Sequence, residues 1–165
     1  MANKIIVADS GPLIALGIVG LLPQLKHLLG EIIVPETVYQ ECIVERDRSG
    51  AKSIYNAVQA TYLTLQQTPA SIILSELCDI LDRGEIEAIS LAKSMSAIIL
   101  IDEKKGRTVA QHYHLDVIGS MAVIITAKQS GIIKTVAPLI SQLEVHGYRL
   151  SNQLKKNVLK RVNEQ

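Results

Sequence analysis

Near its N-terminus the chain reads Ile5-Ile6-Val7-Ala8-Asp9-Ser10-Gly11-Pro12, an apolar run that ends at an acidic residue and a turn signal. A short apolar run bounded by Gly and Pro predicts a buried strand, and Pro12 suits the first turn of a following helix. In an open α/β sheet, ligands bind at the carboxyl ends of the strands. The pattern therefore predicts that Asp9 is a metal ligand, an acid/base group or a helix cap.

Short apolar runs alternate along the chain with longer segments of helical period, which is typical of βαβ units. Strands are predicted at 4–8, 31–34, 62–65, 97–101 and, more weakly, 116–118. Helices are predicted at about 12–18, 22–29, 36–46, 51–60, 71–80, 85–95, 104–113, 120–130, 134–146 and 151–162. Trp and Phe are absent, so Ile, Leu, Val and Ala must fill the core, as in parallel sheets covered on both faces. We expect one three-layer α/β/α domain around about five mostly parallel strands.

Composition and charge exclude several classes of protein. Apolar residues make up 48% and charged residues 20% of the 165 residues, which excludes a disordered chain. The net charge of +1 provides no strong global field for a polyanion. Cys42 and Cys78 lie in helix-like segments without metal-ligand spacing, which predicts a reduced, cytoplasmic protein. We expect no signal peptide and no membrane contact, because the apolar stretches are too short.

Asp102 follows the strongest predicted strand and would lie at the same edge of a parallel sheet as Asp9. Asp is a favoured N-cap residue, so each carboxylate taken alone fits a cap as well as a ligand. Two acids at one sheet edge favour a shared cation site, because hard ions such as Mg²⁺ bind oxygen ligands.

Two further acids lie in predicted helices. Glu41 shares a helix face with Val38 and Cys42 and would need a partner there, or else it faces solvent. Glu85 heads an apolar helical stripe, whereas Glu87 is rotated from it by about 200°. Glu85 is therefore the preferred acid of this helix, and Glu87 is a secondary candidate.

The four candidate catalytic and metal-binding acids are Asp9, Glu41, Glu85 and Asp102. Four neighbouring carboxylates repel one another by several kcal/mol unless a cation neutralises them or some of them hold protons. A bound Mg²⁺ or Mn²⁺ activates a water molecule and stabilises charge on a phosphodiester. The predicted chemistry is metal-assisted phosphodiester hydrolysis.

Two basic segments are candidates for contact with RNA. The first consists of Lys104, Lys105 and Arg107, which either meet phosphates at the rim of the site or decorate an exposed helix start. The second is the amphipathic segment 151–162, with Ser151 as a candidate cap and a basic face formed by Lys155, Lys156, Lys160 and Arg161. This segment is either a solvated helix packed on the domain or a contact for a dimer, a partner or RNA.

Several stretches resemble those of PIN-domain ribonucleases. They are Val7-Ala8-Asp9-Ser10-Gly11-Pro12-Leu13-Ile14-Ala15-Leu16, Val34-Pro35-Glu36-Thr37-Val38-Tyr39-Gln40-Glu41, Arg83-Gly84-Glu85-Ile86-Glu87-Ala88-Ile89 and Leu100-Ile101-Asp102-Glu103. The sequence is most similar to the PIN-like prokaryotic subgroup DUF3368, which the stretches 119–123, 127–133 and 147–151 also resemble. The resemblance covers nearly all of residues 1–165.

The resemblance implies a PIN-like fold, an acidic pocket for Mg²⁺ or Mn²⁺ and cleavage of single-stranded RNA. Many members are toxins of toxin–antitoxin pairs, usually homodimers that a small antitoxin protein holds inactive. Carried over by motif, the metal-binding acids are Asp9, Glu41, Glu85 and Asp102. The resemblance places the Ser10 hydroxyl at the pocket, although Ser also initiates turns by itself. Ser10 and Glu103 are therefore secondary candidates for the site. The third acid is commonly Asp in the family, and here it is Glu85.

The leading hypothesis is a metal-dependent endoribonuclease. Its alternative is a non-catalytic PIN-like module that docks a protein partner or RNA. A small-molecule phosphohydrolase on a similar scaffold is less favoured, because the Asp9-Ser10-Gly11 turn lacks the second nearby Asp that such enzymes generally carry.

Overall fold

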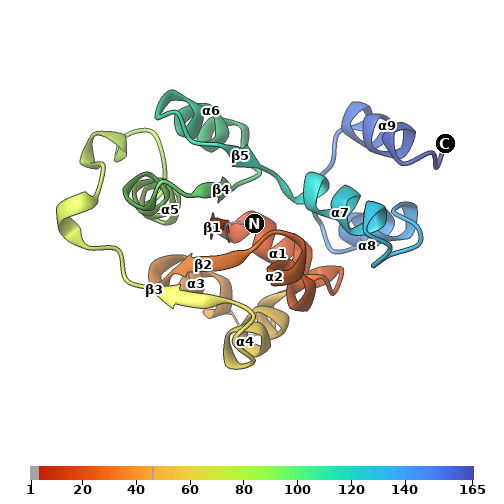
Figure 1. The fold of residues 1–165 in the computed structure, drawn as a ribbon, viewed down its shortest axis with the longest axis horizontal. Coiled ribbons are helices and arrows are strands. Elements are labelled where there is room, and N and C mark those ends of the chain that lie inside the picture. The colour runs from red at the N-terminus through yellow and green to blue at the C-terminus, as the bar shows by residue number, and fades with distance from the viewer. Residues whose placement is uncertain (1–3, 46) are drawn as a thin grey trace.

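The computed structural model describes residues 4–45 and 47–165, and its centre is a five-stranded sheet (Figure 1). The strands are β1 (Ile5–Ala8), β2 (Glu31–Pro35), β3 (Thr64–Gln66), β4 (Ile98–Leu100) and β5 (Val117–Ile118). All neighbouring strands pair in parallel, in the spatial order β3-β2-β1-β4-β5. All five predicted strands are therefore present.

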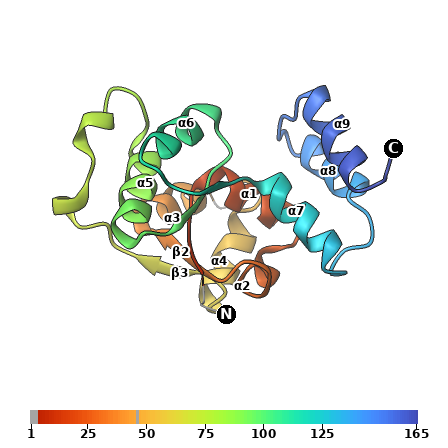
Figure 2. The ribbon, with the colours of Figure 1, turned by 45° about the horizontal axis from the view of Figure 1, so that its top comes forward.

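Helices cover both faces of the sheet and extend beyond one of its edges (Figures 1 and 2). They are α1 (Ser10–Ile18), α2 (Leu25–Leu28), α3 (Glu36–Ile43), α4 (Ala51–Gln59), α5 (Arg83–Met95), α6 (Lys104–His112), α7 (Ser120–Gln129), α8 (Ala137–Val145) and α9 (Asn152–Arg161). The last two helices, drawn in blue, form a pair set apart from the sheet, and α7 connects this pair to the main body.

The strands separate two apolar clusters, because successive side chains of a strand point to opposite faces. In β1, Ile6 and Ala8 belong to the cluster that includes α1, α4 and α7, whereas Val7 belongs to the cluster beneath α5 and α6. Both clusters consist mainly of buried aliphatic side chains. The predicted three-layer α/β/α fold is confirmed.

The predicted helix at 71–80 is wrong. This segment contains two short 3₁₀ turns, Ala70–Ile72 and Ser75–Leu77, joined by an extended Ile73. The consecutive apolar residues 72–74 pack together on the cluster beneath α5, which a helix would prevent by turning them to different faces. The backbone N–H of Leu74 donates a hydrogen bond to Ser90 Oγ on α5, at 3.0 Å.

Several helix boundaries also differ from the prediction. Helix α1 begins two residues early, at Ser10, and the predicted 22–29 helix is a 3₁₀ turn, Leu22–Gln24, followed by α2. Helix α3 ends at Ile43, and position 46 of the predicted helix lies outside the described residues, as do positions 1–3 of the predicted domain. In α9 the predicted cap is confirmed, since Ser151 Oγ accepts a hydrogen bond from Leu154 N at 3.1 Å.

No single helix in the described ranges has both the length and the apolar composition needed to cross a membrane. Only the bent pair Ser10–Ile18 and Leu22–Leu28, with an angle of 109° between its parts, meets both conditions together.

The strand order places the switch in winding direction at β1. The chain adds β2 and β3 on one side of β1, and β4 and β5 on the other side. Ligands of open α/β sheets bind in the crevice outside the carboxyl ends of the strands at such a switch. Asp9 follows β1 and residues 102–103 follow β4, so the topology brings acidic residues to this crevice.

We predict that Gly30→Ala strongly destabilises the fold. Gly30 has a φ of 129°, and a Cβ at this position would lie 2.3 Å from the backbone oxygen of Lys4. That oxygen accepts the hydrogen bond from Glu31 N with which the pairing of β1 and β2 begins, at 2.9 Å. We expect a loss of about 2–3 kcal/mol in the free energy of unfolding, measured by urea denaturation.

Gly20→Ala is the control, because its φ is also positive, at 75°, but its Cβ would meet no atom within 4 Å. An equal loss in both variants would contradict the role of the collision.

Candidate functional site

Asp9 occupies the position of a helix cap without acting as one. It precedes α1 with extended backbone angles, yet no side-chain capping hydrogen bond is found there in the described part of the chain. The residue is 5% exposed. Its Oδ1 is one of two buried side-chain oxygens or nitrogens that lack a hydrogen-bond partner among residues 4–45 and 47–165. A buried carboxylate oxygen without a partner is costly, so this atom is suited to a ligand.

The surroundings of Asp9 disfavour its charged form. Burial raises the pKa of Asp9 to about 7, against the effect of the nearby Ser10 backbone N–H. The negative charges of Asp82, Glu41 and Glu103 raise this pKa further. Asp9 therefore lies among acids from three other segments of the chain.

Glu85 lies at the N-terminus of α5, where it forms a capping box with Asp82. Asp82 Oδ1 accepts a hydrogen bond from Glu85 N at 2.9 Å, and Glu85 Oε2 accepts one from Asp82 N at 3.1 Å. Burial and a hydrogen bond with the side chain of Glu103 raise the pKa of Glu85 to about 8. With a pKa of about 8, Glu85 holds a proton at neutral pH.

Glu41 reaches the same region from α3. Its neighbours Val38 and Cys42 are buried, while Glu41 itself is exposed at the edge of the helix. Its carboxylate lies directly over Gly84, where a Cβ would come within 2.6 Å of Glu41 Oε2 and 2.8 Å of Oε1. Burial, Asp82 and Glu87 raise the pKa of Glu41, while Arg83 and the Gly84 N–H act in the opposite direction.

We predict that Gly84→Ala displaces the carboxylate of Glu41 while the fold stays intact. The added methyl group collides only with the end of an exposed, flexible side chain, and Ala is a better helix residue than Gly by about 0.5–1 kcal/mol. We expect an unchanged or higher melting temperature and about tenfold weaker Mn²⁺ binding in calorimetry.

The matched control for Gly84→Ala is Gly11→Ala. Each glycine is the second residue of its helix, but a Cβ at Gly11 would meet nothing within 4 Å. Equal Mn²⁺ affinity in the two variants would show that the position of the Glu41 carboxylate does not matter.

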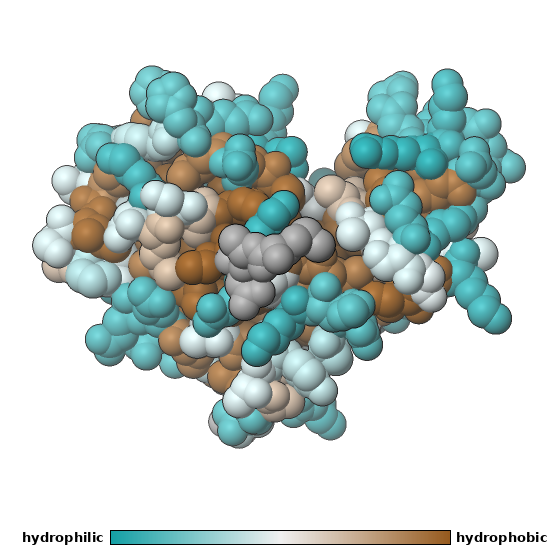
Figure 3. Space-filling view, viewed as in Figure 1, coloured by the Kyte–Doolittle hydropathy of each residue, from teal (hydrophilic) through white to brown (hydrophobic). Residues whose placement is uncertain are grey.

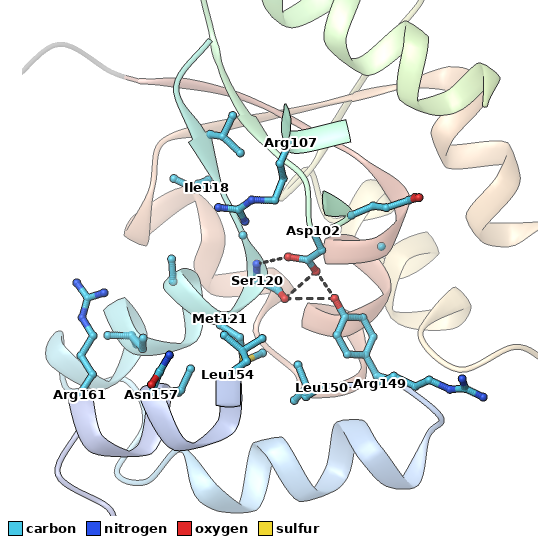
Figure 4. A pocket seen from close by; sticks show the side chains of 18 residues that line it. Asp102, Arg107, Ile118, Ser120, Met121, Arg149, Leu150, Leu154, Asn157 and Arg161 are labelled. Carbon is cyan, nitrogen blue, oxygen red and sulfur yellow. Dashed lines mark hydrogen bonds between the residues drawn. The ribbon is translucent and has the colours of Figure 1, made fainter. Parts of the chain in front are cut away.

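Asp102 lies at the same sheet edge but is bonded in a different direction from Asp9. Its Oδ1 accepts a hydrogen bond from Ser120 N at 2.7 Å, and its Oδ2 accepts bonds from Ser120 Oγ at 2.8 Å and from the Tyr148 hydroxyl (Figure 4). Burial and the Asp102 carboxylate raise the pKa of Tyr148, so its hydroxyl remains a donor. Asp102 does not cap α6, whose N-cap residue is Glu103.

The pairing register explains this difference in direction. Ala8 is paired with Leu100, so Asp9 is level with Ile101 and not with Asp102. Along each strand, side chains alternate between the two faces of the sheet. When this alternation is continued past the strand ends, Asp9 points toward α5 and Asp102 points toward α7.

The remaining predicted residues lie around these acids. Glu87 is buried and pairs with exposed Arg83, at 3.1 Å between Oε2 and Nε. Lys104 and Lys105 are exposed in the first turn of α6. Half-buried Arg107 donates a hydrogen bond to the Ile101 carbonyl at 3.4 Å.

The acids gather without forming a ready-made metal site. Asp9, Glu41 and Glu85 are brought together with Asp82 and Glu103, whereas Asp102 bonds to α7 and to the segment after α8. Over the residues described, no three His, Cys, Asp or Glu side chains are placed so that they could hold an ion.

Sequence reasoning did not assign site roles to Asp82, Ser120 or Tyr148. The spacing of Asp82 and Glu85 is that of a capping box, which could have placed Asp82 beside Glu85. The sequence carries no signal that Ser120 and Tyr148 meet Asp102, because these contacts cross 18 and 46 residues.

Known proteins resemble this chain in sequence pattern and in fold. A family model described as DUF3368: PIN domain matches residues 5–164. Among solved structures, a PilT N-terminus domain protein from the hyperthermophilic archaeon Sulfolobus solfataricus P2 has a TM-score of 0.56 at 12% identity, covering 73% of this chain and 90% of that chain. At this identity, the similarity concerns the fold alone. No curated protein matches the sequence.

Proposed function

Because the chain belongs to the PIN-domain family DUF3368, we propose that it is a divalent-metal-dependent endoribonuclease that cleaves single-stranded RNA. PIN domains are typically nucleases and generally use divalent metal ions. The observation that carries the proposal is Asp9 Oδ1, a buried oxygen without a partner at the carboxyl edge of the sheet. It lies among acids whose mutual repulsion a cation would relieve.

The proposed ligands of Mg²⁺ or Mn²⁺ are Asp9, Glu41, Glu85 and Asp102. When bound, the ion would supply an activated water molecule and stabilise charge on the phosphodiester. The protein contributes the carboxylates, and Glu85, whose pKa is about 8 before an ion binds, releases its proton when it becomes a ligand near neutral pH.

The separation of the acids is consistent with a site that tightens when an ion binds. Carboxylates without a cation repel one another, so their lowest-energy positions keep them apart. Glu41 and Glu103 are exposed and have room to rotate toward Asp9. The donor set consists of the carboxylate oxygens that Mg²⁺ and Mn²⁺ prefer.

The experiment that tests the proposal is cleavage of a panel of single-stranded RNAs by the purified full-length protein. We expect cutting with Mn²⁺ or Mg²⁺ and none after addition of excess EDTA, and readdition of metal should restore it. A double-stranded RNA of the same sequence is the control and should remain uncut. Cleavage that survives EDTA would contradict a metal-dependent mechanism.

A second candidate is a non-catalytic PIN-like module that docks a protein or RNA. Two observations favour it: the described residues contain no ready-made metal site, and three hydrogen bonds already occupy Asp102. Calorimetric titration with Mn²⁺ separates the candidates. Heat of binding at micromolar to millimolar metal supports the nuclease, and its absence supports the module.

The biological role that we propose is that of a cytoplasmic toxin in a toxin–antitoxin pair. By family resemblance, the chain would form a homodimer that a small antitoxin protein inhibits. Growth arrest on expression, relieved by co-expression of the neighbouring reading frame, would support this role. Growth arrest that persists in Asp9→Asn would contradict toxicity through cleavage.

A further inference from the structure

A cleft lies between the acidic end of the sheet and the C-terminal helices, and its volume is about 640 Å³. In the space-filling view it coincides with the notch that separates the main body from α9 (Figure 3). Arg107 and residues 117–119 line one wall, α9 lines the other, and α7 lies between them. We call this space the C-terminal cleft.

Arginine side chains stand on both walls of the C-terminal cleft. Arg107 projects from the side of the sheet, and Arg161 projects from the end of α9 on the opposite wall (Figure 4). Arg149 lines the cleft near its Tyr148 end, and its side chain extends away from Arg107 and Arg161 (Figure 4). Within 4–45 and 47–165, no hydrogen bond or ion pair engages Arg149 or Arg161. These guanidinium groups are available to an anionic ligand.

The surface between these arginines is apolar. Met121 of α7 and Leu150, Leu154 and Val158 of the C-terminal segment line it. Leu154 remains 39% exposed on the face of α9 that borders the cleft. A ligand that fits must therefore combine negative charge with a flat apolar surface.

The C-terminal cleft is continuous with the acidic crevice and has fixed walls. Asp102 and Glu103 line its inner end, and the hydrogen bond from Tyr148 to Asp102 ties the segment after α8 to the sheet. Lys155 pairs with Glu144 at 3.0 Å, which holds α9 against α8. Glu164 accepts hydrogen bonds from Val136 N, at 2.7 Å, and from Lys128, so the chain end is also fixed.

We propose that the C-terminal cleft binds a segment of single-stranded RNA beside the cleavage site, and that helix α9 serves as a substrate-binding wall. The guanidinium groups of Arg107, Arg149 and Arg161 would contact phosphates, and the apolar surface would hold a base. The volume lies within the roughly 300–1,000 Å³ of small-ligand pockets, which suits one or two nucleotides and excludes a duplex. The adjacent cleavage rests on the proposed function, whereas the binding does not.

RNA is favoured over a protein partner by charge. Three arginines line the cleft against two acids, Asp102 and Glu103, and three hydrogen bonds already satisfy the charge of Asp102. An apolar peptide would use the aliphatic surface but would not neutralise Arg149 and Arg161.

The test compares two matched charge reversals in the full-length protein. Arg161→Glu and Lys160→Glu alter neighbouring exposed residues in the last turn of α9, so their effects on net charge and on the helix are alike. Only Arg161 lines the cleft. Binding of a short fluorescein-labelled oligouridylate is measured by anisotropy in EDTA, where cleavage is off, over a series of salt concentrations.

We expect Arg161→Glu to weaken binding about fivefold at about 0.1 M salt and to reduce the salt slope by about 0.7, because one phosphate contact is lost. The double variant Arg149→Glu/Arg161→Glu should weaken binding about 25-fold, and Lys156→Glu/Lys160→Glu far less. This pattern supports the proposal even if the protein never cuts RNA. Equal binding by cleft and control variants, or no binding by the parent, would overturn it and leave the cleft to a protein partner.

Discussion

Asp9→Asn abolishes RNA cleavage while the fold remains intact: this is the first result that we expect. The substitution keeps the size of the side chain and removes the charge of the one buried carboxylate oxygen that lacks a partner among the residues that the structure describes. Loss of a central metal-binding charge should lower the rate of cleavage by about a thousandfold or more. The measurement is the initial rate of cleavage of a labelled single-stranded RNA at fixed Mn²⁺.

Asp116→Asn is the control for this substitution, because Asp116 is an exposed Asp that precedes β5 and so lies at the opposite edge of the sheet from the acids of the site. It should cut RNA at the parental rate. An Asp9→Asn variant that cuts as well as the parent under the same Mn²⁺ would refute the assignment of Asp9.

The same substitution should stabilise the metal-free protein at neutral pH. The pKa of Asp9 is about 7 in the folded chain and 3.8 in its ordinary state. A raised carboxyl pKa means that stability is lost as the pH rises from about 4 to about 7, because the folded state must then bury a charge. Asn does not ionise, so we expect Asp9→Asn to be more stable than the parent by roughly 3 kcal/mol above about pH 7 and equal near pH 4.

Urea unfolding in EDTA at several pH values measures this difference. Saturating Mn²⁺ should reverse the order of the two proteins, because only the parent retains the full ligand set. A difference in stability that does not change with pH would contradict burial of the Asp9 charge.

The second large effect is the pH dependence of Mn²⁺ binding. The pKa values of about 7 for Asp9 and about 8 for Glu85 mean that both groups hold protons at mildly acidic pH. A metal ion must displace these protons, so its affinity falls as they bind more strongly. We expect affinity to rise on the order of a hundredfold from about pH 6 to about pH 8 and to level off above that.

Calorimetry in two buffers with different heats of ionisation counts the protons that the ion displaces. About one to two protons should be released near neutral pH, and fewer in Asp9→Asn. Binding that is independent of pH and releases no protons would contradict participation of Asp9 and Glu85.

The strands were predictable because each is a short apolar run that ends in turn residues. The same reasoning failed at 71–80, where the apolar residues predicted a helix. There the packing of consecutive side chains on the cluster beneath α5, and the hydrogen bond from Leu74 to Ser90, favour an extended chain. Local propensity is weak compared with such tertiary contacts.

The candidate acids were predictable as a group but not in their partners. Asp9 and Asp102 each follow a strand, so a parallel sheet must place both at one edge. Their different directions depend on a shift of one residue in the register between β1 and β4, which composition and spacing do not reveal.

The amino-acid sequence alone determined the parallel α/β sheet and the acidic residues at its carboxyl edge, because both follow from the order of apolar runs and turns along the chain. Only the tertiary structure decided that Glu41 rests over Gly84, that Glu85 lies beside Glu103, and that Tyr148 bonds to Asp102. These contacts join segments distant in the chain. Their geometry depends on strand register and helix packing, which no local pattern encodes.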